Sequence, residues 1–474
     1  MMVLAGYLLL ALLAMLQVLA TGRLVRTTGD RSIIVGSCIL FFWTFAGAWF
    51  FIGDSATGFE GYRIGLGYYY LMEKMFPFEM DRNYLVSLVL YGTFMAGLFL
   101  GLFLTTRRMQ PPSRPWTLRL DPLPLSLAGV ILLVASVLFV LPQLREAMDS
   151  GASFYTVLRA SHGPWYALHS VANELAAFSI LMAQVMVLTR PRQVVSGPGS
   201  VLARWSVPAL VVVLCLYLSL IGDRHSLLTM AIVAGLLLWS MTGKQVVRRG
   251  LPLFALLAVA LLLGGQLRAF GTQELRTLEP QERIDEGPFV LPEIAHVPRR
   301  PEGPVRKAAN VLLSNEMFAA HFSMYGILRN SVPPEPFISM RYLWASAAPA
   351  FVRGERPSSA YDLYARGAHL QEGQGYTIHH AAGWYLNAGF AGPLLGGLLL
   401  GLVWGGVVRL RNRTDKYHPV LGVLPFLFVA FLPQVLRNGP EAYRTLLVEG
   451  LLLPVLILLL TSAYRRRGRT PDIP

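Results

Sequence analysis

Apolar residues along this chain come in long, nearly uncharged blocks rather than at the spacing of an amphipathic helix or a half-buried strand. A block of about 18 or more apolar residues is long enough to cross a bilayer as an α-helix. The blocks lie at 3–20, 32–52, 85–104, 122–142, 167–189, 207–222, 226–242, 251–267, 389–408, 419–436 and 445–463. The pattern therefore predicts an all-α polytopic membrane protein with about eleven transmembrane helices.

Basic residues are unevenly distributed among the loops between these predicted spans. The segments 21–31, 105–121, 190–206, 243–250, 409–418 and 464–474 contain 21 of the 41 Lys and Arg residues but only four of the 27 acidic residues. Short cytoplasmic loops are enriched in Lys and Arg. We therefore expect a protein of the bacterial inner membrane with its N-terminus outside and its C-terminus in the cytoplasm.

Composition narrows the function classes further. Only 14% of the residues are charged, whereas a soluble domain has about a quarter. The net charge of +14 follows from the loop distribution and does not indicate nucleic acid as a partner. The only cysteines, Cys38 and Cys215, lie in apolar blocks, so neither a disulfide framework nor a cysteine-based metal site is expected. The block 3–20 lacks a small-residue cleavage site, so we expect it to remain as a span.

Two long segments lie on the predicted outer side, where we expect the function to be located. The aromatic-rich segment 53–84 predicts an interfacial helix, and an aromatic anchor without chemistry is the simpler interpretation. Within 268–388, residues 271–306 predict a mobile linker or lid, 307–330 an amphipathic helix and 337–351 a second helix. The predicted organisation is therefore transmembrane helices in 1–267, a large, partly helical periplasmic loop in 268–388, and transmembrane helices with a cytoplasmic tail in 389–474.

Four arginines lie at the predicted outer ends of spans, namely Arg224, Arg268, Arg437 and Arg444. Charged residues near membrane depth are unfavourable and usually functional, and the positive-inside trend depletes outer turns of arginine. Guanidinium groups bind phosphate oxygens through charge-assisted, often bidentate hydrogen bonds. This cluster predicts a pyrophosphate site, and the alternative is contact with lipid headgroups or with nearby carboxylates such as Asp223.

His379 and His380 form an adjacent pair in a glycine-rich segment at the mouth of a predicted span. Histidine titrates near neutral pH, so one of the two is a candidate general base, with a structural role as the alternative. No carboxylate or cysteine stands at ligand spacing around these residues and His369, so no metal site is expected.

The passage that contains these histidines has a recognisable order of residues. Residues 373–392 are Gly-Gln-Gly-Tyr-Thr-Ile-His-His-Ala-Ala-Gly-Trp-Tyr-Leu-Asn-Ala-Gly-Phe-Ala-Gly. Together with the many spans and one large late outer loop, this passage resembles the oligosaccharide repeat-unit polymerases, or O-antigen polymerases of the Wzy type. The Gly-Asp-Arg-His-Ser turn at 222–226 and the Leu-Arg-Asn-Gly stretch at 436–439 resemble the arginine-containing turns of that family.

The resemblance implies a GT-C-like membrane glycosyltransferase that needs neither a metal nor another cofactor. Its substrates would be undecaprenyl-pyrophosphate-linked glycans, and its partners membrane lipids and the chain-length regulator and flippase of the same pathway. The four arginines would bind the pyrophosphate, and His379 or His380 would be the base, with Glu316 or Asp362 as substitutes. The glycan would contact Arg329, Arg341, Tyr376 and Trp384.

Two other functions share some of these features. An O-antigen ligase, which transfers finished glycan to a lipid core, has a similar span count, outer arginines and a late-loop histidine. A flippase or transporter for lipid-linked sugars would show repeated halves and polar groups near the membrane midplane. The chain has no internal repeat and its ionisable residues stop at the outer half of the spans. The Gly-x-Tyr-x-Asn-x-Gly-x-x-Gly pattern in 383–392 favours the polymerase.

Overall fold

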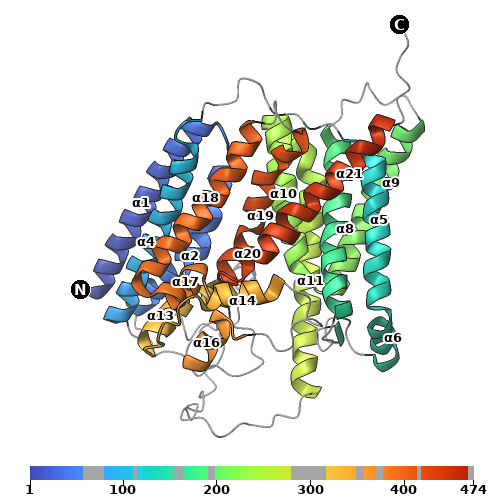
Figure 1. The fold of residues 1–474 in the computed structure, drawn as a ribbon. Coiled ribbons are helices and arrows are strands. Elements are labelled where there is room, and N and C mark those ends of the chain that lie inside the picture. The colour runs from blue at the N-terminus through green and yellow to red at the C-terminus, as the bar shows by residue number, and fades with distance from the viewer. Residues whose placement is uncertain are drawn as a thin grey trace. The chain divides into compact units, whose positions relative to one another are not determined.

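The structure is a computed structural model in which α-helices account for nearly all described residues (Figure 1). It describes residues 1–56, 80–109, 116, 118, 120–151, 154, 157–158, 164–189, 198–278, 316–347, 357–368, 377–413 and 418–467. Within these residues there is no β-strand, and one isolated bridge joins Ile378 to Asn438. The predicted all-α class is confirmed for the part of the chain that the structure describes.

Nine helices among the described residues are long and apolar enough to cross a membrane. They are α1 (Met2–Thr28), α2 (Ser32–Ala56), α4 (Arg82–Thr106), α5 (Pro122–Phe139), α8 (Pro164–Thr189), α10 (Arg224–Thr242), the run of α17 (His380–Ala388) and α18 (Gly392–Asn412), the run of η5 (Pro419–Val423) and α19 (Leu424–Arg437), and the run from α20 (Ala442–Thr445) to α21 (Leu453–Arg467). The chain is thus a multi-pass membrane protein.

The two remaining predicted spans also lie on helices. Residues 207–222 fall largely on α9 (Pro198–Leu220), whose apolar part, Arg204–Leu220, is shorter than the nine spans. Residues 251–267 fall on α11 (Val246–Leu278). The total of eleven spans and the orientation of the termini therefore stay predictions.

Aspartates fix the beginnings of several membrane helices. Asp81, Asp121 and Asp223 precede α4, α5 and α10, and each side chain accepts a backbone N–H of the first turn. Such caps satisfy donors that have no partner within the helix and place negative charge at the positive end of its dipole. The ends of these spans are therefore set by local chemistry as well as by hydropathy.

The chain divides into two compact units. Unit 1 comprises Met1–Pro112, Asp285–Asn412 and Phe431–Leu447, and unit 2 comprises Ser113–Ile284, Arg413–Ala430 and Val448–Pro474. The described residues of the predicted outer loop after 316 thus belong to the same unit as α1, α2 and α4. Each unit is therefore built from three segments that are separated in the sequence.

Glycines bring α4 and α18 of unit 1 into backbone contact. The contact involves Gly97 and Gly101 on α4 and Gly397, Gly401 and Gly405 on α18. A Cβ atom on Gly397 would lie 2.0 Å from the carbonyl oxygen of Phe94, and one on Gly101 would lie 2.4 Å from that of Leu398. Small residues at four-residue spacing allow this close approach between membrane helices.

The helix that begins at Glu316 differs from the predicted amphipathic helix in how much of its surface is buried. The spacing of apolar residues predicts an amphipathic helix over 307–330, whereas α13 (Glu316–Arg329) is buried on all sides from 320 to 327. The reason is that α2, α4, α16 (Ala360–Gly367) and α17 all contact it. The ring of Phe322 packs against Phe51 and Tyr84, at centroid distances of 5.2 and 5.9 Å. Figure 1 shows α13, α14, α16 and α17 gathered where α4 and α18 begin.

The second helix predicted in this region corresponds to α14 (Ile338–Ala347), which ends before the predicted limit of 351. The predicted interfacial helix at 53–84 is described only at its two ends, through α2 and the residues from Met80 onward. The predicted linker at 271–306 lies outside the described residues except for the backbone of α11.

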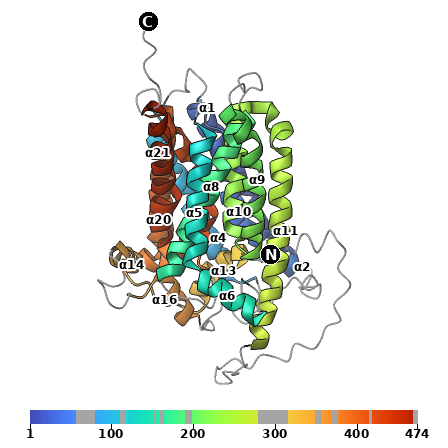
Figure 2. The same ribbon diagram turned by 90° about the vertical axis from the view of Figure 1, so that its right-hand side faces the viewer.

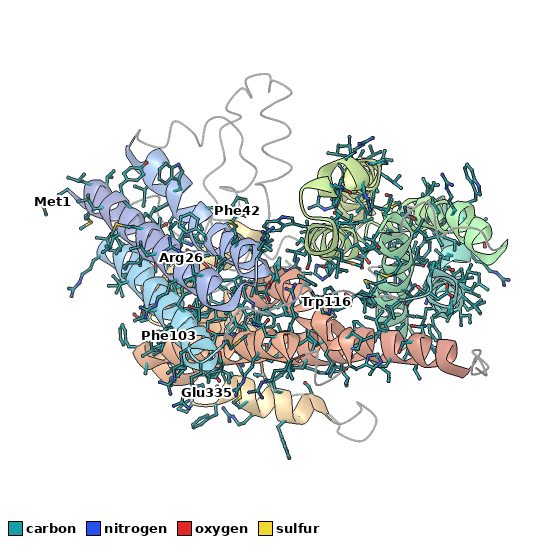
Figure 3. All side chains as sticks on the ribbon, turned by 90° about the horizontal axis from the view of Figure 1, so that it is seen from above. Met1, Arg26, Phe42, Phe103, Trp116 and Glu335 are labelled. Atoms are coloured by element: carbon teal, nitrogen blue, oxygen red, sulfur yellow. The ribbon has the colours of Figure 1, made fainter. Side chains whose placement is uncertain are left out.

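Unit 2 is a bundle in which α5, α8, α9, α10 and α11 lie side by side (Figure 2). Three of the nine described helices that are long and apolar enough to span a membrane, α5, α8 and α10, lie wholly in unit 2. The most buried of these three is α8, which contacts α5, α9, α10 and α21. The indole of Trp116, labelled in Figure 3, donates to the Pro419 carbonyl at 3.0 Å and covers Gly422. The short helix α6 (Leu141–Ser150) follows α5 directly.

Candidate functional site

The histidine passage and the late arginine turn meet in unit 1. The backbone N–H of Ile378 donates to the carbonyl of Arg437 at 3.1 Å, next to the bridge between Ile378 and Asn438. The Nδ1 atom of His380 lies 3.0 Å from the Gly439 carbonyl oxygen. Two segments about 60 residues apart in the sequence therefore form one site, which we call the histidine–arginine site and define as residues 377–387 and 437–444.

His380 fastens α17 to the turn that precedes α20. Its ring is fully buried, and Nδ1 donates to the carbonyl of Gly439. Nε2 therefore acts as the acceptor, and it receives the indole N–H of Trp384 at 3.1 Å and lies 3.1 Å from the Tyr443 hydroxyl. Both ring nitrogens thus have partners within the protein.

His379 and a histidine from α13 share a contact on α2. His379 caps α17, because its Nδ1 accepts the N–H of Ala381 at 3.1 Å, and its Nε2 lies 3.4 Å from Oγ1 of Thr44. The carbonyl of Thr44 accepts from Nδ1 of His321 at 2.7 Å, and the Tyr84 hydroxyl donates to the other nitrogen of His321 at 2.9 Å. His321 was not among the predicted site residues, since no local motif surrounds it.

Burial controls the charge of two of these histidines. It lowers the pKa of His321 to about 4, an effect that the hydrogen bond to Thr44 only partly offsets. Burial also holds the pKa of His379 well below its usual value, and the neighbouring His380 and His321 act in the same direction. Both rings are therefore neutral at physiological pH. A general-base role for His379 or His380 stays a prediction, and the observed partners by themselves favour a structural role.

We expect the free energy of unfolding to fall as the pH is lowered from 6.5 towards 4. In this window the unfolded chain protonates His321 while the folded chain does not, because the folded pKa is about 4 against 6.5. The total loss from this residue is on the order of 3 kcal/mol. Thermal unfolding in detergent at a series of pH values measures it. His321→Gln should flatten the dependence, and an unchanged pH profile in that variant would contradict the assignment.

Glu441 joins the arginine turn to α14 and α16. Its Oε1 accepts from Oγ of Ser339 and from the backbone N–H of Ala360, both at 2.8 Å. Burial raises the pKa of Glu441, although these two hydrogen bonds oppose the change. The sequence marks Glu441 only as a neighbour of two arginines. Its partners lie 102 and 81 residues away, so only the folded chain reveals this connection.

The four predicted phosphate-binding arginines form two pairs. Arg437 and Arg444 belong to unit 1, where Arg437 is half-buried and Arg444 is exposed. Arg224 and Arg268 belong to unit 2, on α10 and α11. The Cγ atom of Arg224 lies 3.8 Å from the position of a Cβ on Gly264, one helical turn before Arg268, whose side chain lies outside the described residues. Convergence of all four arginines stays a prediction.

The two arginines that are predicted to contact the glycan each form an ion pair. Arg329 pairs with Asp81, the cap of α4, at 2.6 Å. Arg341 pairs with Glu335, which is labelled in Figure 3, and both side chains are exposed. The first pair fastens α13 to α4, and the second lies at the surface beside α14.

The structure describes some of the other residues that the sequence predicts for the site. Trp384 is half-buried, and its ring lies against Gly396 while its N–H donates to His380. Asp362 is engaged in the capping box of α16. The prediction for Tyr376 falls outside the described residues, as does that for the side chain of Glu316.

Within the described part of the chain, no group of three or more His, Cys, Asp or Glu side chains is placed to hold a metal ion. Comparisons with protein-family profiles, with curated proteins and with solved structures find no match to this chain. The family resemblance therefore depends on the motifs quoted above.

Proposed function

We propose that this protein is a GT-C-like glycosyltransferase of the bacterial inner membrane that polymerises oligosaccharide repeat units on its outer face. It transfers the glycan of one undecaprenyl-pyrophosphate-linked unit to the non-reducing end of another. The observation that supports this proposal is the contact between 377–383 and 437–439. These segments carry two of the three motifs that resemble the polymerase family, and a shared reaction would need both in one place.

The proposed reaction places specific demands on the protein. A hydroxyl oxygen of the acceptor attacks the anomeric carbon of the donor sugar, and a new C–O bond forms as the bond to the pyrophosphate oxygen breaks. Undecaprenyl pyrophosphate leaves with the bonding electrons, and the hydroxyl proton passes to a base. Fixed cations stabilise the developing charge on the leaving group. Arg437 and Arg224 are the leading candidates for that role, and Arg444 and Arg268 are the further candidates.

The test is the length distribution of surface glycan in the host organism after deletion of the gene. We expect the ladder of chain lengths to collapse to a single repeat unit, and the wild-type gene to restore it. Arg437→Ala or Arg224→Ala should fail to restore the ladder although the protein is folded and inserted. Arg409→Ala, which changes an exposed arginine at the end of α18, is the control and should restore it fully.

Other outcomes would replace the proposal. Full-length glycan that stays on the carrier lipid would indicate a ligase. Unpolymerised lipid-linked units on the cytoplasmic face would indicate a flippase. An unchanged ladder would exclude all three functions, and full activity of both arginine variants would exclude the pyrophosphate site.

A further inference from the structure

A second cluster of polar side chains lies in unit 2, where α8 meets the first turn of α10. Asp223 caps α10, and it accepts the N–H of Ser226 at 3.1 Å and the hydroxyl of the same residue at 2.6 Å. It also accepts the amide Nδ2 of Asn173 at 2.9 Å. On the next residue of α8, Oε1 of Glu174 lies 3.9 Å from Nε2 of His225. The predicted arginine turn at 222–226 is thus held against α8.

Two acceptor oxygens in this cluster have no hydrogen-bond partner among the residues that the structure describes. They are Oδ1 of Asn173, a residue only 2% exposed, and Oε2 of Glu174. A buried acceptor without a donor is unfavourable, and two on adjacent residues are unusual. The cluster still reaches the surface, because the side chains of Glu174 and His225 are 16% and 28% exposed. A ligand that enters beside His225 could supply the missing donors.

The surroundings of Glu174 restrict the chemistry of such a ligand. Asp223 and Glu449 both exert a repulsive field on the Glu174 carboxyl. Glu449 lies in a π-helical stretch, Leu446–Leu452, a rare geometry that is frequent at functional sites. Pro454 follows this stretch and has no N–H for the regular helical bond. An anion is therefore disfavoured at Glu174, whereas a neutral ligand with several hydroxyl donors suits the free acceptors.

We propose that Asn173 and Glu174 bind hydroxyl groups of the sugar that is attached directly to the pyrophosphate of the lipid-linked substrate. This inference rests on the proposed function, in which Arg224 binds the pyrophosphate. Arg224 follows Asp223 in the chain, and Asp223 holds the amide of Asn173. Groups that bind phosphate and groups that bind hydroxyls are then neighbours in the protein, as the pyrophosphate and its sugar are in the substrate.

The experiment compares two lipids that differ only in the sugar. Undecaprenyl pyrophosphate and the same lipid bearing one N-acetylglucosamine are titrated against the full-length protein in nanodiscs, and the two Kd values are measured. The wild type should bind the sugar-bearing lipid roughly tenfold more tightly, the effect of one or two well-placed hydrogen bonds. Asn173→Leu and Glu174→Leu should bring the ratio of the two Kd values close to one, because they weaken binding of the sugar-bearing lipid much more than binding of the sugarless lipid.

Two further variants serve as references. Glu174→Gln keeps an acceptor oxygen and should retain most of the discrimination. Gln184→Leu changes a buried amide on the same helix, away from the cluster, and should leave both Kd values as in the wild type. Size-exclusion profiles and Tm values of all variants report whether each one is folded.

The outcomes separate the inference from the proposed function. Equal affinity of the wild type for both lipids would overturn the sugar site, and so would an equal loss of both affinities in Asn173→Leu and Glu174→Leu. Binding of the sugarless lipid that is weakened by Arg224→Gln supports the proposed function in either case. If the wild type binds neither lipid, both the proposed function and this inference are wrong.

Discussion

Replacement of Gly397 by leucine is expected to prevent α4 and α18 from packing, so that little folded protein is recovered from the membrane. The new Cβ would lie 2.0 Å from the Phe94 carbonyl oxygen and 2.9 Å from the Leu98 nitrogen. Both are backbone atoms of α4, so the clash can be relieved only if the two helices separate. We expect a loss of at least about 3 kcal/mol, the upper end for overpacked interiors. The yield of monodisperse protein and its Tm in detergent measure the effect.

The same helix offers a matched control. A Cβ on Gly406 would meet nothing within 4 Å. Gly406→Leu introduces the same side chain into α18 and raises helix propensity by about 1 kcal/mol, so its Tm should equal or exceed that of the wild type. If Gly397→Leu behaved like Gly406→Leu, the close α4–α18 contact would be wrong.

Hydropathy was sufficient to locate the membrane helices, because burial in lipid acts on each segment separately. All eleven predicted blocks lie mainly on helices. The four-residue spacing of the glycines at 397, 401 and 405 is also visible in the sequence. That spacing predicts a close helix contact but cannot identify the partner helix, because the choice of α4 depends on how the whole unit packs.

The candidate site, unlike the membrane helices, could be predicted only in part from the sequence. The motif at 373–392 led to His379 and His380, but not to His321, which the sequence places 58 residues before His379. Apolar residues at helical spacing predicted a one-sided helix near α13, whereas its polar residues His321 and Ser323 are satisfied inside the unit. Contacts of this kind arise only when distant segments meet, so a local pattern cannot reveal them.

Replacement of Arg411 by methionine is expected to destabilise unit 1 strongly. Arg411 Nη1 and Asp30 Oδ1 lie 2.7 Å apart, and their side chains are only 14% and 2% exposed. The other oxygen of Asp30 is also buried and has no hydrogen-bond partner within the described part of the chain. Without the guanidinium, the carboxylate would be left charged and unpaired in a buried position, which costs about 3–5 kcal/mol. The Tm of the purified protein should fall accordingly.

The double variant Asp30→Asn with Arg411→Met distinguishes loss of charge pairing from loss of packing. Asp30 also caps α2 by accepting the N–H of Ser32 at 2.9 Å. Asparagine is an equally good cap, and it has no charge to leave unpaired. The double variant should therefore recover most of the lost Tm, and Arg409→Met, at an exposed arginine of the same helix, should change it little. If the double variant is as unstable as Arg411→Met alone, the arginine stabilises α18 through its packing, and the buried charge of Asp30 is not the cause.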